Sequence, residues 1–227
     1  MSTTPDVPDT YARTGFDDLL GLRLGHRVMC RDARRLADLT AAWAAGTTTM
    51  TAARGRALVS WTDRLATEIH QHHTAEDDIL WPVLVRRAGA AVDLTALSDD
   101  HAALDPVLTE LRGATRDAVA GRGEPAVASA AHRALAEQLV EHIDEEERDL
   151  FPVIYAHVPL AEWKAVEKGV RERGGDMFFV LPRLASVCTD EEFARLRAEA
   201  GPVLMVLLWF ARRRLHRDAQ LLFGTDA

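Results

Sequence analysis

Two stretches of the sequence place a histidine four residues before a glutamate. His72 precedes Glu76 in the segment HHTAEDDILWPVL, and His142 precedes Glu146 in the segment HIDEEERDLFPVI, 70 residues later. Residues four apart lie on the same face of a helix, so the imidazole and the carboxylate of each pair can bind one ion. Each pair is followed at the same distance by Leu, an aromatic residue and Pro. Because both pairs occupy the same position in two similar segments, we interpret them as parts of an internal repeat that binds metal and not as surface salt bridges.

A second pair of similar segments adds one lone histidine each. The residues around His26 match those around His101 with an offset of 75, and both histidines lie within apolar stripes of helical spacing. The chain is therefore predicted to contain two helical hairpins, and each supplies one lone histidine and one His-x3-Glu pair. The candidate metal ligands are His26, His72, Glu76, His101, His142 and Glu146.

This donor set combines imidazoles with carboxylates and contains no thiolate, which suits iron or manganese better than a structural zinc site. Two carboxylates can each bridge or chelate, so the pattern predicts two ions a few ångströms apart. Six protein ligands leave open positions on two ions, where O2, peroxide or a bridging oxide can bind. Three residues remain open as further ligands or as acceptors that orient an imidazole: His73, Asp105 and Glu147.

Helices must position these side chains, because the apolar pattern is helical from Phe16 onward and no convincing strand pattern appears. Four long helices are predicted at about 16–45, 51–87, 94–119 and 125–157. Connections this short make neighbouring helices antiparallel. We therefore predict an all-α fold: an up-down-up-down four-helix bundle over residues 16–157, after a flexible tail at residues 1–15.

Residues 158–227 are predicted to form a helical extension that packs on the bundle or on a partner. One or two helices are expected at 191–223, because Pro202 lies inside this segment. An apolar stretch at 202–210 is followed by the basic cluster Arg212–Arg214. Packing of this helix, including a homodimer contact, is the favoured interpretation. A roof over the metal site and a position on a membrane surface are the alternatives.

Composition excludes several classes of protein. The formal net charge of −8 disfavours a general nucleic-acid binder. Two cysteines, Cys30 and Cys188, exclude a disulfide scaffold and fit a reducing cytosol. The first residues contain no apolar signal segment, and the longest apolar run, at 200–211, is far shorter than the roughly 20 residues of a membrane span. We expect a cytoplasmic protein without a transmembrane segment.

Four motifs together resemble the hemerythrin-like family, which carries the HHE cation-binding domain: LRLGHRVM, HHTAEDDILWP, LSDDHAAL and EHIDEEERDLFP. The resemblance covers about residues 16–157. It implies a four-helix bundle that holds two iron ions with an oxo or hydroxo bridge, with manganese or zinc as other occupants. It also implies reactivity with O2, nitric oxide or peroxide. The positions that match the family's ligands are the six named above.

The sequence departs from the family pattern at one position and leaves two others open. Oxygen-carrying hemerythrins have His-x3-His on the third helix, but here the second position is Asp105, which argues against a carrier with five histidines and two carboxylates. Glu147 has the His-x4 spacing of the acidic ligand in those proteins, whereas the repeat register favours Glu146. Some HHE members use the residue directly after the second-helix histidine, which is His73 here.

Three functions fit these observations. The first is a diiron protein that reacts with O2, nitric oxide or peroxide. The second is an oxygen or iron sensor that signals through its C-terminal extension. The third is a diiron oxidase or oxygenase that acts on an organic metabolite in a pocket formed by the extension. The residues alone do not decide whether the protein is an enzyme.

Overall fold

The computed structural model describes residues 12–224, apart from the side chains at positions 199–200 and 202–204. Within this part the chain is helical, and its only β-type pairing is one isolated bridge between Arg13 and Pro159. The all-α fold class predicted from the sequence is confirmed.

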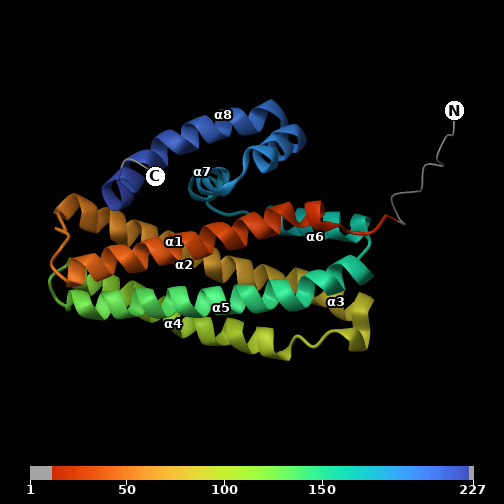
Figure 1. The fold of residues 1–227 in the computed structure, drawn as a ribbon, viewed down its shortest axis with the longest axis horizontal. Coiled ribbons are helices and arrows are strands. Elements are labelled where there is room, and N and C mark those ends of the chain that lie inside the picture. Colours follow the sequence, from red (N-terminus) through yellow and green to blue (C-terminus); the bar gives the residue numbers. More distant parts are fainter. Residues whose placement is uncertain (1–11, 225–227) are drawn as a thin grey trace.

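Four long helices form a bundle, namely α1 (Leu20–Ala44), α2 (Ala52–Ala75), α4 (Thr95–Val119) and α5 (Pro125–His157). Helices α1 and α4 each pack against both α5 and α2, which closes the ring of contacts. The chain reverses direction from each long helix to the next (Figure 1). Gly46 and Gly121 follow α1 and α4 with φ angles of 72° and 71°, which glycine adopts without strain from a side chain.

A layer of buried polar side chains divides the apolar core of the bundle into two clusters. One cluster lies toward the α1–α2 turn and includes Leu36, Leu58, Leu111 and Leu135. The other lies toward the opposite end and includes Leu80, Leu97, Leu150 and Ile154. The polar layer between them contains the histidines and glutamates singled out from the sequence.

The second predicted helix is interrupted. Helix α2 ends at Ala75, a π-helical turn, η3 (Glu76–Leu80), follows, and α3 (Trp81–Ala88) continues the direction. The Trp81 N–H donates to the carbonyl oxygen of Glu76, five residues back. Pro82 has no N–H to donate to the carbonyl four residues earlier, which weakens the α-helical pattern here. The equivalent Pro152 lies inside α5 without such a turn, so the repeat alone did not predict it.

Three further helices form the C-terminal region, α6 (Leu160–Arg173), α7 (Met177–Val187) and α8 (Asp190–Phe223). Helices α7 and α8 pack on each other and on α1 and α2 (Figure 1). Gly201 is non-helical, with φ 67° and ψ −167°, so α8 consists of two halves that meet directly before Pro202. No helix in the described part of the chain is both long enough and apolar enough to cross a membrane.

Short segments complete the described chain. The 3-10 turns η2 (Phe16–Leu19) and η4 (Gly89–Ala91) precede α1 and follow α3. The Thr14 hydroxyl donates to the Val158 carbonyl oxygen at 2.9 Å, and the Leu160 N–H donates to the Ala12 carbonyl oxygen at 2.9 Å. These bonds hold residues 12–14 against the start of α6. The rest of the predicted tail, residues 1–11, lies outside the described residues.

Candidate metal centre

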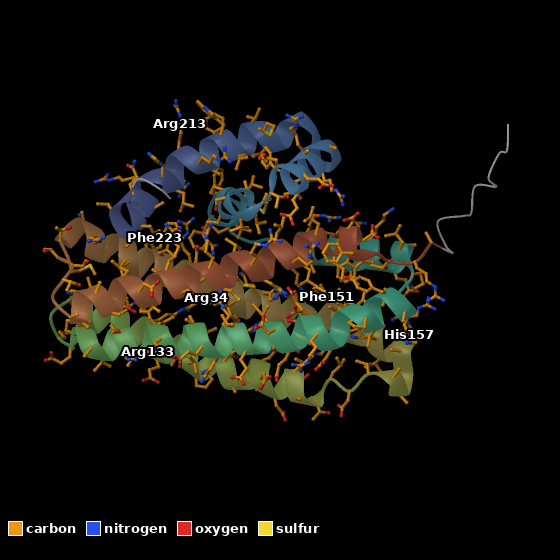
Figure 2. All side chains as sticks on the ribbon, viewed as in Figure 1. Arg34, Arg133, Phe151, His157, Arg213 and Phe223 are labelled. Carbon is orange, nitrogen blue, oxygen red and sulfur yellow. The ribbon has the colours of Figure 1, made fainter. Side chains whose placement is uncertain are left out.

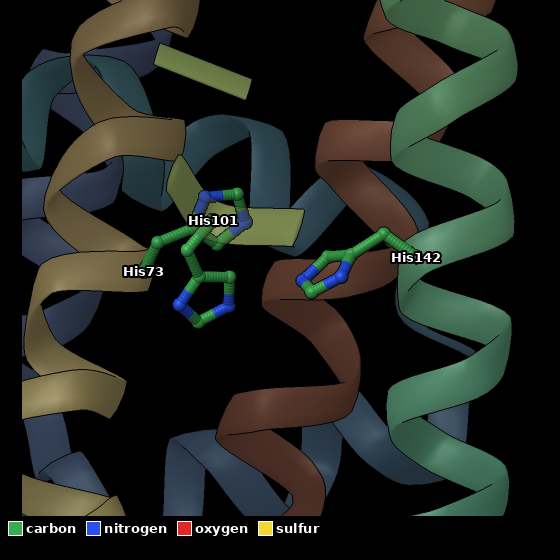
Figure 3. A group of neighbouring side chains, drawn as sticks. All are labelled: His73, His101 and His142. Carbon is green, nitrogen blue, oxygen red and sulfur yellow. The ribbon is translucent and has the colours of Figure 1, made fainter. Parts of the chain in front are cut away.

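Seven side chains meet in the polar layer of the bundle and form two adjoining groups. In the first group, the ligand atoms of His26, His72, Glu76 and Glu146 all lie within 4.8 Å of one another. In the second group, the same holds for His73, His101 and His142, whose rings converge from α2, α4 and α5 (Figure 3). All seven are buried except His72, which is half-buried.

Each glutamate faces both groups. Oε1 of Glu76 lies 3.0 Å from Nε2 of His72, and its Oε2 lies 3.7 Å from Nε2 of His101. Oε2 of Glu146 lies 3.6 Å from Nε2 of His26 and 3.9 Å from Nε2 of His142. The two carboxylates therefore stand where they can bridge two ions, one held by each group of imidazoles.

Several buried polar atoms of this cluster make no hydrogen bond of good geometry, whereas Nε2 of His26 and Nε2 of His72 lie 3.0 Å apart. The atoms without a hydrogen bond are both carboxylate oxygens of Glu76 and of Glu146, Nε2 of His73 and of His101, and both ring nitrogens of His142. Burying a polar atom without a partner costs free energy, so such atoms are rare in native proteins. Imidazole nitrogens and carboxylate oxygens that point at common centres are the donors that iron and manganese bind. The residues present therefore fit a two-cation centre.

Without a cation, the charges in the cluster are poorly balanced. Burial by itself lowers the pKa of His26, but the charge of Glu146, with Glu147 and Glu76, raises this pKa to about 10. Burial, and then the charge of His72, lowers the pKa of His73 to about 2. Burial, and then the charge of neighbouring Glu76, raises the pKa of Glu146 well above its usual value. Burial by itself would also raise the pKa of Glu76, but His72 and His26 lower it well below its usual value. The two carboxylates therefore do not ionise equally, and metal cations would offset the repulsion between them.

Two further carboxylates contact the outer nitrogens of two of the imidazoles. The Nδ1–H of His26 donates to Oε1 of Glu147 at 2.9 Å, and the Nδ1–H of His101 donates to Oδ1 of Asp77 at 2.9 Å. These bonds hold the Nδ1 proton of each ring on its outer side, so that its Nε2 faces the centre. Sequence reasoning missed the role of Asp77, although the signal was present. Asp77 follows Glu76 as Glu147 follows Glu146, so the two acids are equivalent in the 70-residue repeat.

Two aromatic residues at equivalent positions of the repeat cover the same rings. Trp81 stacks on His101 with ring centroids 5.6 Å apart, and Phe151 stacks on His26 at 6.4 Å. The Nε1–H of Trp81 donates to the Ser98 hydroxyl at 3.2 Å. Both aromatic side chains are buried and exclude water from this side of the centre.

The structure brings together all six residues predicted as ligands, and it adds His73 to them. The cluster therefore contains five histidines and two glutamates. The sequence had argued against this composition, because Asp105 stands where oxygen-carrying hemerythrins have a histidine. Asp105 itself lies elsewhere: its side chain is 57% exposed, and Nδ1–H of the exposed His70 donates to it at 2.9 Å. Glu147 contacts the far side of His26 rather than the centre.

Two surface grooves lie away from the cluster. One, of about 620 Å³, lies between α1 and α5 and is lined by residues such as Arg34, Ala136 and Glu141. The other, of about 330 Å³, lies between α2 and α8 near Arg56 and Leu221. Neither is lined by any of the seven side chains, so neither supports the prediction of a substrate pocket that reaches the metal ions.

A family model described as the hemerythrin HHE cation-binding domain matches residues 21–154, which include all seven side chains. Neither a curated protein nor a solved structure matches the chain.

Proposed function

Because the chain belongs to the hemerythrin HHE cation-binding family, we propose that it is a non-heme diiron protein whose centre reacts with O2, nitric oxide or peroxide. The observation that carries this proposal is the buried cluster of five imidazoles and two carboxylates, most of whose inward atoms make no hydrogen bond. The mixed nitrogen and oxygen donors favour iron, with manganese or zinc as less suitable occupants.

We assign His73, His101 and His142 to one ion and His26 and His72 to the other, with Glu76 and Glu146 bridging the two. Glu146 is preferred to Glu147 because it is buried within the cluster, whereas Glu147 bonds to the outer nitrogen of His26. Seven side chains do not fill the coordination shells of two six-coordinate ions. A bound pair of iron ions would supply open positions for a small ligand and a two-electron change between diferrous and diferric states.

The chain's own residues prepare the centre for this chemistry. Asp77 and Glu147 hold the Nδ1 protons of His101 and His26, so each Nε2 carries a lone pair toward the ions. Glu76 and Glu146 offset part of the cationic charge. Trp81 and Phe151 keep water from the rings that they cover, which protects a reduced centre from side reactions.

Metal analysis tests the assignment directly. Elemental analysis and an absorption spectrum of the purified chain should give two iron ions per chain and bands of a diferric centre. His72→Ala and His142→Ala should each lose metal, whereas His70→Ala, which changes an exposed histidine outside the cluster, should keep it. A full complement of metal in either cluster variant would refute the ligand assignment.

Rapid mixing separates the reactions that such a centre supports. The diferrous protein is mixed with O2, nitric oxide or hydrogen peroxide, and the absorption is followed with time. A stable ligand-bound spectrum that reverses on removal of O2 indicates reversible binding. Rapid conversion to the diferric spectrum indicates redox turnover. No reaction with any of the three would contradict the proposed function.

A sensor that signals through its C-terminal extension is the second candidate, and one contact favours it. Arg183 of α7 is 2% exposed; its Nε–H donates to Asp32 of α1 at 2.6 Å, and it also pairs with Glu68 of α2. Glu68 lies one helical turn before His72. A change at the centre therefore has a short route to α7. Hydrogen exchange in α7 and α8 that is the same with and without metal would contradict this role.

A further inference from the structure

Helix α8 presents an apolar surface that no other described part of the chain covers. Its inner side packs against the rest of the molecule through Leu208, Ala211, Leu215 and Leu222, which are at most 5% exposed. The outer side shows four large apolar residues within five positions, and they are between 44% and 57% exposed: Val206, Leu207, Trp209 and Phe210. The start of α7 adds Met177 and Phe178, which are 53% and 40% exposed. We name these six residues together the α8 face.

Arginines border this face. The Arg213 guanidinium lies 4.0 Å from the centre of the Trp209 ring, and that of Arg214 lies 5.5 Å from the centre of the Phe178 ring. Residues 201–224 contain four arginines against one aspartate, in a chain whose net charge is −8. Arg213 lies on the side of α8 that points away from the bundle (Figure 2). The charge next to the exposed apolar residues is therefore opposite in sign to that of the whole chain.

We propose that the α8 face docks on an anionic lipid surface, with α8 lying in the plane of the membrane interface. Trp, Phe, Val and Leu side chains enter the boundary between headgroups and acyl chains, while arginines extend to the lipid phosphates. The segment from Val206 to Arg217 is roughly 18 Å long as a helix, and α8 is the outermost helix on its side of the molecule (Figure 1). A flat surface can therefore reach the exposed apolar residues of α8.

Charge and composition favour lipid over the other occupants. A homodimer through this helix, as predicted from the sequence, would bring two arginine clusters close to each other. A nucleic acid would pair with the arginines but would leave the aliphatic residues and the phenylalanines of the face in water. An anionic bilayer uses the apolar residues and the arginines together. This proposal is independent of the metal centre, because none of the seven cluster residues belongs to the face.

Vesicle sedimentation tests the proposal with the full-length, metal-loaded chain. Vesicles of phosphatidylglycerol and phosphatidylcholine should pellet the chain at low salt, and vesicles of phosphatidylcholine alone should pellet much less. The variant with Trp209→Ser and Phe210→Ser should bind roughly tenfold more weakly. The variant with Arg212→Gln, Arg213→Gln and Arg214→Gln should bind on the order of a hundredfold more weakly. All of these side chains are exposed, so metal content and helicity should stay normal.

Matched substitutions away from the α8 face control for general loss of charge or apolar surface. Val85→Ser with Val127→Ser changes two exposed apolar residues, at 59% and 53%. Arg122→Gln, Arg148→Gln and Arg171→Gln remove three arginines whose side chains are 62–68% exposed. Neither control should alter binding. The proposal is overturned if anionic vesicles do not bind the chain, or if the α8 variants and the controls bind equally. It is also overturned if Trp209→Ser abolishes a dimer, seen by analytical ultracentrifugation, without changing lipid binding.

Discussion

Asp77 and Glu147, 70 residues apart in the sequence, make the same contact with one histidine of each group in the candidate metal centre. Asp77, which follows the histidine pair of the first hairpin, accepts a hydrogen bond from His101 of the second. Glu147 of the second hairpin accepts one from His26 of the first. In the same way, Trp81 of the first hairpin stacks on His101 of the second, and Phe151 of the second hairpin stacks on His26 of the first. Each hairpin therefore orients a histidine of the other, so the centre forms only when the two pack together.

Removal of these acceptors should weaken metal binding while the ligands remain. Asp77→Asn and Glu147→Gln keep the shape but remove the charge that supports the imidazole, and such changes cost roughly 10–100-fold in metal affinity. The affinity is measured by competition with a chromophoric chelator. Asp78→Asn and Glu145→Gln, at exposed neighbouring positions, serve as controls. Equal affinities in all four variants would show that the two contacts do not support the centre.

His73 should bind metal, although its counterpart in the second hairpin, Ile143, is apolar. His73→Ala leaves the group of His101 and His142 with two imidazoles, so we expect about one of the two ions to be lost or to bind far more weakly. Elemental analysis after dialysis measures this. His70→Ala, three positions earlier and exposed, should retain both ions. Two tightly bound ions in the His73 variant would remove it from the ligand set.

Arg183 should be important for stability because it is the buried cation between two helices of the bundle and α7. Arg183→Met would remove this partner from Asp32, and loss of one partner of a buried ion pair costs about 3–5 kcal/mol. Because Arg31 and the Trp61 N–H still bind Asp32, we expect a loss at the lower end of that range. Urea unfolding of the metal-loaded protein measures the free energy of unfolding. Arg116→Met breaks an ion pair with Asp63 whose arginine is 53% exposed, and it should cost about 1 kcal/mol or less. Similar losses in both variants would contradict the assignment.

Attachment of α8 to α1 should weaken in acid. Hydrogen bonds from Arg27 lower the pKa of Glu192 to about 2, with smaller help from the Thr189 N–H and Arg23. A carboxyl whose pKa is lower in the folded state stabilises the fold above its ordinary pKa of 4.5. This contribution is lost as the pH falls from about 4.5 to about 2.

The comparison with Glu192→Gln isolates this contribution from other acid-labile groups. The difference in free energy of unfolding between wild type and variant should be on the order of 1 kcal/mol at neutral pH and should shrink over that acid range. Urea unfolding at several pH values measures it. A difference that stays constant down to pH 2 would show that the Arg27 contact does not act through the charge of Glu192.

Much of this architecture follows from local sequence pattern. His72 and Glu76, and likewise His142 and Glu146, share a helix face because of the helical period alone. These two pairs could therefore be recognised from the sequence without knowledge of the tertiary structure. The same holds for the ends of the long helices, because glycine and proline act on their own backbone. For 191–223 the sequence left one or two helices open, and the structure places a break at Gly201. The internal repeat then indicated that the two halves meet around one centre.

Tertiary structure decided the rest, because it depends on which side chains of separate helices face each other. His73 and Asp105 looked equally suited to bind metal, yet one lies in the core and the other pairs with His70 at the surface. The π-helical turn at Glu76, the anchoring of α7 by Arg183 and the exposure of Trp209 depend in the same way on packing between distant segments. A periodic pattern defines the face of a helix, but only its neighbours determine what that face contacts.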